Sequence, residues 1–482
     1  MPISIYNTLT RKLEEFKSIR PGEVRMYVCG VTVYDECHLG HARSAFIFDL
    51  IRNYFKYRGY EATFIKNITD VDDKIINRAR EEITDKNSLL FGKGLNSAVK
   101  EIAERYTKSF YEDMGLLGIA KADKEPKATE HIKDIIKMIS TLIDNGHAYV
   151  SGGDVYFDVR KFVGYGRLSN QDKDQMLAGA HHDNLEKKRD SLDFALWKSA
   201  KENEPEWDSP WSKGRPGWHI ECSAMSMRYL GDNFDIHGGG RDLIFPHHEN
   251  EVAQSECATG KPFANYWIHN GLLTINGEKM SKSLGNYVSI KDVLARYPSD
   301  VLKIFFLGAH YSHPIDFTWE KMEAARNAYE RILILFDRIN REEGPLKAIT
   351  SGGDTGNKDI FNLKQRFEEA MDDNFNTPVA IGALFDLVNL GNKILEKRPQ
   401  LHQFMVKYAA DILTELGGVL GLSFKTASNG LSDKEIQKLV GARIEAKKSG
   451  DFKEADRIRE ELKQKGIILE DDKDRTHWRR KV

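Results

Sequence analysis

The stretch from residue 23 to residue 69 reads as a strand, a turn, a helix and a second strand, and this order constrains the fold most. Residues 23–34, EVRMYVCGVTVY, are rich in β-branched and apolar side chains, and a polar turn, DECHLG, follows them. Residues 41–60 place apolar side chains at helical spacing before a stop at Gly59, and residues 61–69, EATFIKNIT, are strand-like again. A helix that joins two such strands forms a right-handed βαβ unit. The sequence therefore predicts an α/β fold with a doubly wound parallel (Rossmann-like) sheet.

A second α/β stretch lies far along the chain, at residues 234–286. We therefore expect the sheet to be split by an insertion that runs from about residue 100 to about residue 220. The end of this insertion, KENEPEWDSPWSKGRPGW, is rich in Pro, Gly and Trp, which is typical of a surface loop that closes over a site. Helical spacing dominates later, and residues 319–340 carry apolar side chains at i, i+3 and i+4. We expect a helical bundle there, followed by a small C-terminal domain.

The charge balance limits the kinds of partner. The formal net charge is -2 at pH 7, which excludes a globally basic nucleic-acid binder but leaves room for local basic patches. Residues 1–17 lack the apolar core of a signal peptide, and no apolar run approaches ~18 residues. We therefore expect a cytoplasmic protein without a membrane partner. Four cysteines are too few for a disulfide framework and favour buried thiols or metal and catalytic roles.

The tetrapeptide HLGH stands where the first strand gives way to the helix, at His38 to His41. Unpaired backbone N–H groups and the helix dipole favour an anion at such a position. Both histidines would then face phosphate, and Gly40 would let a nucleotide approach the backbone because it has no Cβ. The alternative is that the two histidines only cap the helix.

A second motif, GEKMSKSLGN, covers residues 277–286 and places Lys279 and Lys282 three apart between glycines. Lysines on a mobile loop of this kind can close on a triphosphate and neutralise the charge that grows during phosphoryl or adenylyl transfer. Alone, the run fits a solvated basic loop equally well. Its combination with HLGH, in the other half of a split α/β sheet, favours nucleotide chemistry.

The pair of motifs is similar to the signature of class I aminoacyl-tRNA synthetases, with Leu39 in place of the commoner isoleucine. Four further runs resemble the cysteinyl-tRNA synthetase family: YVCGVTVYDECHLGHAR, NITDVDDKI, GWHIECSAM and DIHGGGRDLIFPHHENE. The resemblance is strong over about residues 2–320 and general beyond them. It implies a catalytic domain in two halves (1–100 and 221–290), a connective insertion (101–220), a stem-contact region (291–330), a helical bundle that binds tRNA (331–425) and a C-terminal anticodon-recognition domain (426–482).

The metal question has a local and a non-local part. His247 and Glu251 are four apart and would share one face of a helix, whereas the zinc-peptidase pattern His-Glu-x-x-His fails at Val252. Nothing local links this pair to a cysteine. The resemblance implies one zinc ion, bound by Cys29, Cys222, His247 and Glu251. It leaves Cys37 and Cys257 outside the site, as ordinary buried thiols.

The resemblance also implies the rest of the substrate pocket. Thr69, Trp218 and Asp242 would line the amino-acid site, with Asp242 as the partner of the α-ammonium group. Gly238, Gly239 and Gly240 would allow adenosine to approach the backbone closely, because glycine has no Cβ. Three glycines in a row equally make a tight turn, and a structural role is open for each of the other three residues.

These residues together imply a reaction. ATP with Mg²⁺ would bind the HLGH and KMSKS elements, the cysteine carboxylate would attack the α-phosphorus, and pyrophosphate would leave. The charge on the phosphates would be stabilised by His38, His41, Lys279 and Lys282, with Lys282 the most important. Zinc would select the substrate thiolate over the serine hydroxyl, since a hydrophobic pocket gains only ~1–3 kcal/mol from so small a difference. The cysteinyl group would then pass to tRNA(Cys) on a monomeric enzyme.

Two other functions fit part of the sequence. A ligase that transfers cysteine to a small amine, as in mycothiol biosynthesis, resembles the catalytic half but has no need of the chain after about residue 325. A catalytically inactive RNA-binding paralogue has no need of intact HLGH and KMSKS motifs. Near the C-terminus, Trp478 lies among Arg475, Arg479, Arg480 and Lys481 and either stacks on an RNA base or packs inside its own domain.

Overall fold

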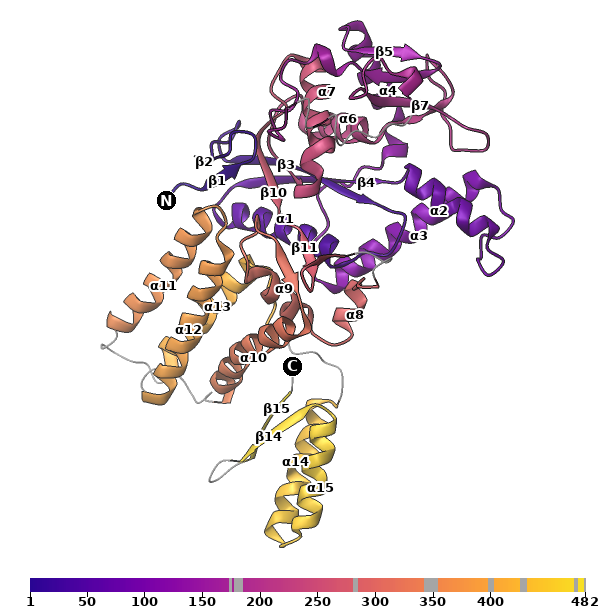
Figure 1. The fold of residues 1–482 in the computed structure, drawn as a ribbon. Helices are drawn as coiled ribbons and strands as arrows, with labels where there is room; N and C mark the ends of the chain where they lie inside the picture. The colour runs from indigo at the N-terminus through magenta and orange to yellow at the C-terminus, as the bar shows by residue number, and fades with distance from the viewer. Residues whose placement is uncertain are drawn as a thin grey trace. The chain divides into compact units, whose positions relative to one another are not determined.

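The computed structural model describes residues 1–172, 176, 185–280, 285–341, 354–397, 403–424, 431–471 and 476–480 (Figure 1). Its internal contacts divide the chain into two compact units. The first unit contains residues 1–292, 309–317 and 369–377, and the second contains residues 293–308, 318–368 and 378–482. Every predicted site residue that the structure describes belongs to the first unit.

A four-stranded parallel sheet, in the order β10-β9-β3-β4, organises the first unit. Its strands are β3 (Glu23–Thr32), β4 (Glu61–Thr69), β9 (Phe234–Gly240) and β10 (Ala264–Asn270), and helix α1 (Leu39–Tyr57) joins the first two. The predicted doubly wound sheet, with one pair of strands from each side of the insertion, is therefore confirmed. The strand order reverses between β3 and β9, and α/β proteins bind their ligands at the carboxyl ends of strands at such a point.

Several smaller elements surround this sheet. They are the hairpin of β1 (Ser4–Asn7) and β2 (Lys12–Glu15) and the helices α2 (Asp73–Thr84), α3 (Leu95–Leu116), α6 (Trp218–Leu230) and α7 (Glu249–Thr259). Helix α2 begins at an N-cap, because the side chain of Asp72 accepts a hydrogen bond from the Lys74 N–H at 2.8 Å. It buries Ile75, Ile76 and Ala79, which share one helical face.

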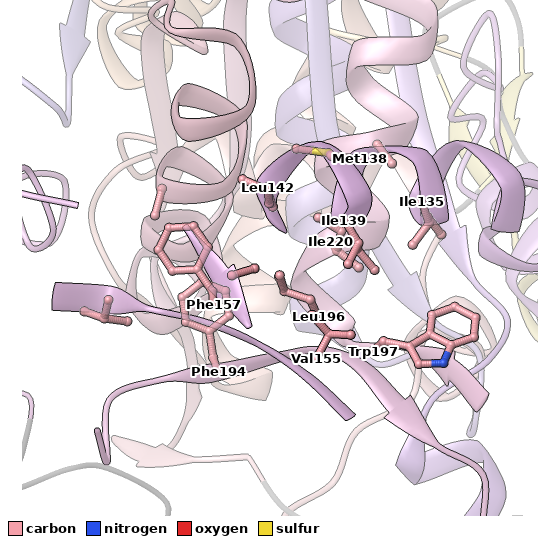
Figure 2. Close-up of a cluster of buried hydrophobic side chains, with 14 of the residues drawn as sticks. Ile135, Met138, Ile139, Leu142, Val155, Phe157, Phe194, Leu196, Trp197 and Ile220 are labelled. Atoms are coloured by element: carbon pink, nitrogen blue, oxygen red, sulfur yellow. The ribbon is translucent and has the colours of Figure 1, made fainter. Parts of the chain in front are cut away.

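The insertion folds as an antiparallel sheet, β5-β6-β7-β8, with a helix beside it. These elements are α4 (Ile132–Asp144), β5 (Ala148–Ser151), β6 (Asp154–Phe157), β7 (Phe194–Ser199) and β8 (Gly214–Pro216). Figure 2 shows the apolar core that they share, in which Ile139 of α4 packs in one cluster with Leu196 and Trp197 of β7. Ile220 of α6 belongs to the same cluster. The insertion is thus packed onto the helix that carries Cys222.

A second, three-stranded sheet carries Lys279. Its strands, in the order β12-β11-β13, are β11 (Leu273–Ile275), β12 (Glu278–Lys279) and β13 (Ile315–Phe317). Asn276 and Gly277 join β11 to β12, and both have positive φ, 50° and 81°. An Asn-Gly pair of this kind makes the two-residue hairpin turn whose twist matches that of the strands. Lys282, the other predicted lysine, lies outside the described residues.

The second unit is mainly helical, as predicted. Its main helices are α9 (Ser299–Leu307), α10 (Trp319–Arg341), α11 (Asp354–Asp372), α12 (Thr377–Lys397) and α13 (Gln403–Val419). Residues 369–372 of α11, residue 377 of α12 and residues 290–292 of α8 (Ile290–Leu294) belong to the first unit. By length and composition, Thr377–Glu396 of α12 could cross a membrane, with a mean hydropathy of 1.2. Of that window 44% is buried inside the fold, and packed core helices of soluble proteins pass the same test.

A small module ends the described chain. It consists of α14 (Asp433–Lys448), α15 (Phe452–Gln464), β14 (Ile467–Asp471) and β15 (Thr476–Arg480). Trp478 packs against its apolar core, and the indole N–H donates to Gln437 Oε1 at 3.1 Å. The structure therefore places Trp478 against the core of its own domain. Arg475 and Lys481 lie outside the described residues.

We expect Ile139→Ala to lower the free energy of unfolding by about 2–5 kcal/mol, because Ile139 is fully buried and its truncation leaves a cavity in the insertion core. Val150→Ala on β5 is the matched control, since Val150 is 48% exposed. That change should stay within about 0.5 kcal/mol. Urea denaturation followed by circular dichroism measures both variants, and equal effects would mean that Ile139 is not part of a packed core.

Candidate functional site

Four side chains from three distant segments converge at the carboxyl end of β3. Cys29 lies in β3, Cys222 in α6, His247 in the short helical turn η5 (Ile244–His248) that leads into α7, and Glu251 in the first turn of α7. Their ligand atoms all lie within 4.8 Å of one another. One carboxylate oxygen, Glu251 Oε1, is 3.3 Å from Cys29 Sγ and 3.1 Å from His247 Nε2. The structure thus brings together the four residues that the family resemblance assigned to a metal, and it buries three of them almost completely.

A second group of ligand atoms shares two of these residues. Cys29 and Glu251 also lie within 4.8 Å of His237 and His248. His237 Nε2 is 2.9 Å from Glu251 Oε2, and His248 Nε2 is 3.8 Å from Glu251 Oε1. Helical spacing placed His248 away from the face that His247 and Glu251 share, so the sequence did not predict it as a ligand, and His237 was not predicted either. The paired histidines in FPHHENE were a visible signal for His248, but nothing in the sequence marked His237.

The charges in this cluster are strongly coupled. Burial would raise the pKa of Glu251, but the imidazoles of His237 and His247 outweigh it and lower the pKa to about 2. A hydrogen bond from Cys29 lowers the pKa of Cys222 to about 6. Burial, the hydrogen bond to Cys222 and its charge raise the pKa of Cys29 well above its usual value. Burial would lower the pKa of His247, but Glu251 and Cys222 outweigh it and raise the pKa to about 10. A carboxylate and a thiolate therefore share one buried space with a single imidazolium at neutral pH.

A bound cation suits this space, because buried negative charge is costly unless it is paired. The Tyr27 hydroxyl is buried beside the two cysteines, and burial, the charges of Cys222 and Cys29 and a hydrogen bond with Cys222 raise its pKa. Two sulfurs, one imidazole and one carboxylate are donors that zinc accepts. The cluster is therefore compatible with a metal site, on chemistry as well as on distance.

A bulge in β3 supports the cysteine at its end. The register of β3 on β4 shifts between Val28 and Val31, so that Cys29 and Gly30 lie in the bulge. The Gly30 N–H donates to the side-chain oxygen of Asn67 at 2.8 Å. A Cβ on Gly30 would lie 1.6 Å from the Asn67 carbonyl oxygen, so only glycine fits. Neither residue was predicted from the sequence, although a glycine inside a strand pattern is a signal for a bulge.

Two of the three predicted pocket residues border the cluster. Thr69 Oγ1 accepts a hydrogen bond from Asn67 Nδ2 at 3.2 Å, and Asn67 Oδ1 is 3.6 Å from the Cys222 sulfur. The rings of Trp218 and His247 have centroids 4.3 Å apart. Asp242 is instead exposed just after β9. Its charge acts on the His38 imidazole, which places it near the HLGH turn.

The three predicted glycines end strand β9. They are Gly238, Gly239 and Gly240. A Cβ on Gly238 would lie 2.3 Å from the ring of Phe48 in α1, so the packing of α1 on the sheet requires glycine at this position whether or not a nucleotide binds. The glycines lie at the carboxyl edge, where α/β proteins bind ligands.

The HLGH turn begins α1 with interlocked histidines. His38 Nδ1 accepts from the Gly40 N–H at 3.1 Å, and His41 Nδ1 accepts from the His38 N–H at 3.3 Å. Burial lowers the pKa of His38, and it lowers the pKa of His41 to about 3. Because each Nδ1 is an acceptor, each neutral ring carries its proton on Nε2. The turn therefore offers N–H donors to an anion, and the imidazoles bring no positive charge at neutral pH.

The chain that follows KMSKS lies on the HLGH turn. His38 and Ser289 form an antiparallel β-bridge, and the Tyr287 hydroxyl donates to the Glu36 carbonyl oxygen at 2.8 Å. Lys291 Nζ is 3.2 Å from Glu36 Oε2. The two predicted nucleotide elements are therefore joined at this flank, and Lys279 is exposed on β12.

Asn67→Ala should lower the free energy of unfolding by about 1–3 kcal/mol, because it leaves the Gly30 N–H without its acceptor. Asn53→Ala on α1 is the control, since Asn53 is only half-buried and its bond to Asp49 is long, at 3.4 Å. Urea denaturation of both variants measures the difference. An Asn67 variant as stable as the Asn53 variant would contradict a structural role for the bulge contact.

Comparison with known protein families covers most of the chain. Residues 15–327 match the model of the class I (C) tRNA synthetase catalytic domain. Residues 366–425 match a DALR domain, and residues 430–479 match the cysteinyl-tRNA ligase anticodon binding domain. The matched regions therefore include catalytic and anticodon-binding parts in one chain.

Relatives and solved structures agree with these matches. The chain is 50% identical to the cysteine–tRNA ligase of Thermodesulfovibrio yellowstonii and 48% identical to that of Geobacillus thermodenitrificans, and each alignment covers 99% of both chains. A Mycobacterium tuberculosis methionyl-tRNA synthetase in complex with methionyl-adenylate has a TM-score of 0.64 at 13% identity, over 83% of this chain and 91% of that one, which supports the fold alone. The chain therefore belongs to the cysteine–tRNA ligase family of class I aminoacyl-tRNA synthetases.

Proposed function

We propose that the protein activates L-cysteine with ATP, which forms cysteinyl-adenylate and releases pyrophosphate, and then transfers the cysteinyl group to tRNA(Cys). The convergence of two thiols, an imidazole and a carboxylate at the carboxyl end of β3 carries this proposal. Strand β3 leads directly into the HLGH turn, so a thiol-binding and a phosphate-binding element share one edge of the sheet.

Zinc is assigned to Cys29, Cys222, His247 and Glu251 rather than to the group that contains His237 and His248. Glu251 Oε1 faces both Cys29 and His247, whereas Glu251 Oε2 is taken by His237. His247 Nδ1 lies 2.9 Å from His219 Nδ1, which suits a ligand oriented through its second nitrogen. Two sulfurs also match the preference of zinc for soft donors.

When bound, zinc would supply a soft acid that takes the substrate thiolate and not the serine hydroxyl. The residues of the chain shape the remaining pocket. Trp218 lies against His247, Thr69 lies beside Asn67, and both are assigned to the amino acid. Asp242 is assigned to the α-ammonium group, as an exposed carboxylate near the HLGH turn.

ATP is assigned to the HLGH turn, the end of β9 and the KMSKS lysines. His38 and His41 would donate Nε2–H groups to phosphate oxygens, next to the N-terminus of α1 and Gly40. Because both rings are neutral, the negative charge of the triphosphate would be neutralised by Lys279, Lys282 and Mg²⁺. The glycines that end β9, Gly238 to Gly240, are assigned to the adenosine.

The acceptor is assigned to tRNA(Cys) because residues 430–479 match an anticodon-binding domain. A ligase for a small amine has no use for such a domain, so that alternative is not favoured. The proposal includes a cytoplasmic, monomeric enzyme without a membrane partner, as expected for an enzyme of translation.

Exchange of pyrophosphate into ATP tests the activation step. We expect kcat/KM for exchange with cysteine to be about 10⁴-fold above that with serine. Cysteine and serine differ by one atom and would make similar contacts with a pocket, but only the cysteine thiolate would form a strong coordination bond to zinc. Removal of zinc by a chelator should abolish the preference, and added zinc should restore it. Equal exchange with serine would contradict the proposed role of the metal.

Transfer to unfractionated tRNA tests the second step. With [³⁵S]cysteine and ATP, we expect acid-precipitable label that depends on tRNA and disappears after mild alkaline treatment, since the product is an ester. Exchange without any tRNA charging would contradict the proposed acceptor and favour a small amine.

Cys222→Ser should lose zinc and lower kcat/KM for cysteine by at least about 100-fold. Loss of a residue that only hydrogen-bonds to a metal ligand can already reduce activity by about 100-fold, and Cys222 is itself a proposed ligand. Cys257→Ser is the control, as a half-buried thiol outside the cluster. Metal analysis and exchange kinetics are measured on both variants. Full activity in a Cys222→Ser protein that has lost its zinc would disprove the assignment.

A further inference from the structure

Arg43 is fully buried in the first unit and uses its guanidinium to hold backbone. It donates to five carbonyl oxygens: Gly271 at 2.8 Å, Leu272 at 2.9 Å, His313 at 2.6 Å, Tyr311 at 3.3 Å and His310 at 3.4 Å. A buried guanidinium usually pairs with a carboxylate, since neutral carbonyls offset less of its desolvation cost. The contacts of Arg43 therefore favour a role in fixing geometry over a role in adding stability.

The five carbonyls belong to two segments that lead into strands. Leu272 directly precedes β11, and His313 lies just before β13. The two segments also bond to each other, because the Gly271 N–H donates to the Tyr311 carbonyl at 2.8 Å. Strands β11 and β13 pair in parallel, and β12 with Lys279 pairs with β11. Arg43 thus holds the base of the sheet that carries Lys279.

The other end of the link is the HLGH turn. Arg43 is in the first part of α1, two residues after His41. Its neighbour Ser44 adds a second contact, since Ser44 Oγ donates to Asn270 Oδ1 at 3.0 Å. The backbone of α1 is rigid over so short a distance, so the position of the guanidinium is fixed relative to His41.

We infer that Arg43 is a positioning residue for adenylate formation. Its guanidinium sets the β11–β12 hairpin, and with it Lys279, at a fixed place relative to His38 and His41. The two phosphate-binding elements come from opposite halves of a sequence-split sheet. The His38–Ser289 bridge joins the chain after KMSKS to the HLGH turn, and Arg43 adds a contact at the base of the hairpin that precedes KMSKS. This inference rests on the proposed function and adds to it a residue that touches neither substrate nor metal.

A lysine cannot replace this arginine. The guanidinium presents a planar fork whose two terminal nitrogens reach five carbonyls, whereas an ammonium group has three donors on one nitrogen and cannot satisfy all five from one position. Arg52 provides a matched control on the same helix. It is also buried, but it pairs with Asp49 and donates to the Lys121 carbonyl at 2.8 Å, away from the β11–β13 sheet.

The test is a double-mutant cycle on the full-length, zinc-loaded protein. Arg43→Lys, Lys279→Ala and the double variant are compared in cysteine-dependent exchange, with Arg52→Lys made in the same two backgrounds. We expect Arg43→Lys to lower kcat at least tenfold, to leave KM for cysteine within twofold and to leave the zinc content unchanged. In the Lys279→Ala background the same change should cost less than twofold, because the lysine that it positions is already absent.

Additive effects of Arg43→Lys and Lys279→Ala would overturn the inference, as would an Arg52→Lys protein that shows the same coupling. Circular dichroism checks that each variant folds. If Arg43→Lys does not fold, the cycle is repeated with Ser44→Ala, which removes only the bond to Asn270. Coupling of Ser44→Ala to Lys279→Ala then supports the positioning contact, and additivity overturns it. Absence of exchange in the unmodified protein would instead be a failure of the proposed function.

Discussion

The parallel pairing of β3 with β9 is the contact on which the rest of the site depends. It joins strands that lie about 200 residues apart in the sequence and aligns their carboxyl ends at one edge. That edge receives Cys29 and the HLGH turn from the first half of the catalytic region and the Gly238–Gly240 run from the second. Helix α6, helix α7 and the turn η5 before α7 then bring Cys222, Glu251 and His247 to the end of β3.

Burial of charge is the second constraint. The Glu251 carboxylate and the Cys222 thiolate are almost completely buried, and the His247 imidazolium balances only one of these two negative charges. Such a cluster is costly to fold unless something positive completes it. The same burial acts in the opposite direction at the HLGH turn, where it keeps His38 and His41 neutral. One edge of the sheet therefore contains a cation-seeking cluster and a neutral hydrogen-bond donor pair side by side.

Much of the fold could be predicted from the sequence. The spacing of apolar side chains predicted β3, α1 and β4 with nearly their observed bounds. Each of these segments buries apolar side chains at the spacing typical of its own strand or helix. The pairing of β3 with β9 could not follow from local pattern, and neither could the approach of Cys29 to Cys222. Those two cysteines were associated only through the family resemblance.

What the sequence hid are effects of burial and of backbone contacts. His237 and His248 look like ordinary histidines until the fold places both near Glu251. The Asn67 side chain accepts a hydrogen bond from Gly30 in a β-bulge, and a bulge has only a weak sequence signal. Arg43 binds backbone carbonyl groups, and because every residue has one, the sequence does not reveal which carbonyls it binds. The neutrality of His38 and His41 depends on surroundings that are remote in the sequence.

Zinc K-edge X-ray absorption spectroscopy of the purified protein distinguishes the two possible donor groups most directly. Ligation by Cys29, Cys222, His247 and Glu251 gives two sulfur scatterers at about 2.3 Å and two nitrogen or oxygen scatterers at about 2.0–2.2 Å. A single sulfur scatterer would instead indicate the group that contains His237 and His248. A zinc ion without any sulfur ligand would contradict a thiolate-rich metal site at the end of β3.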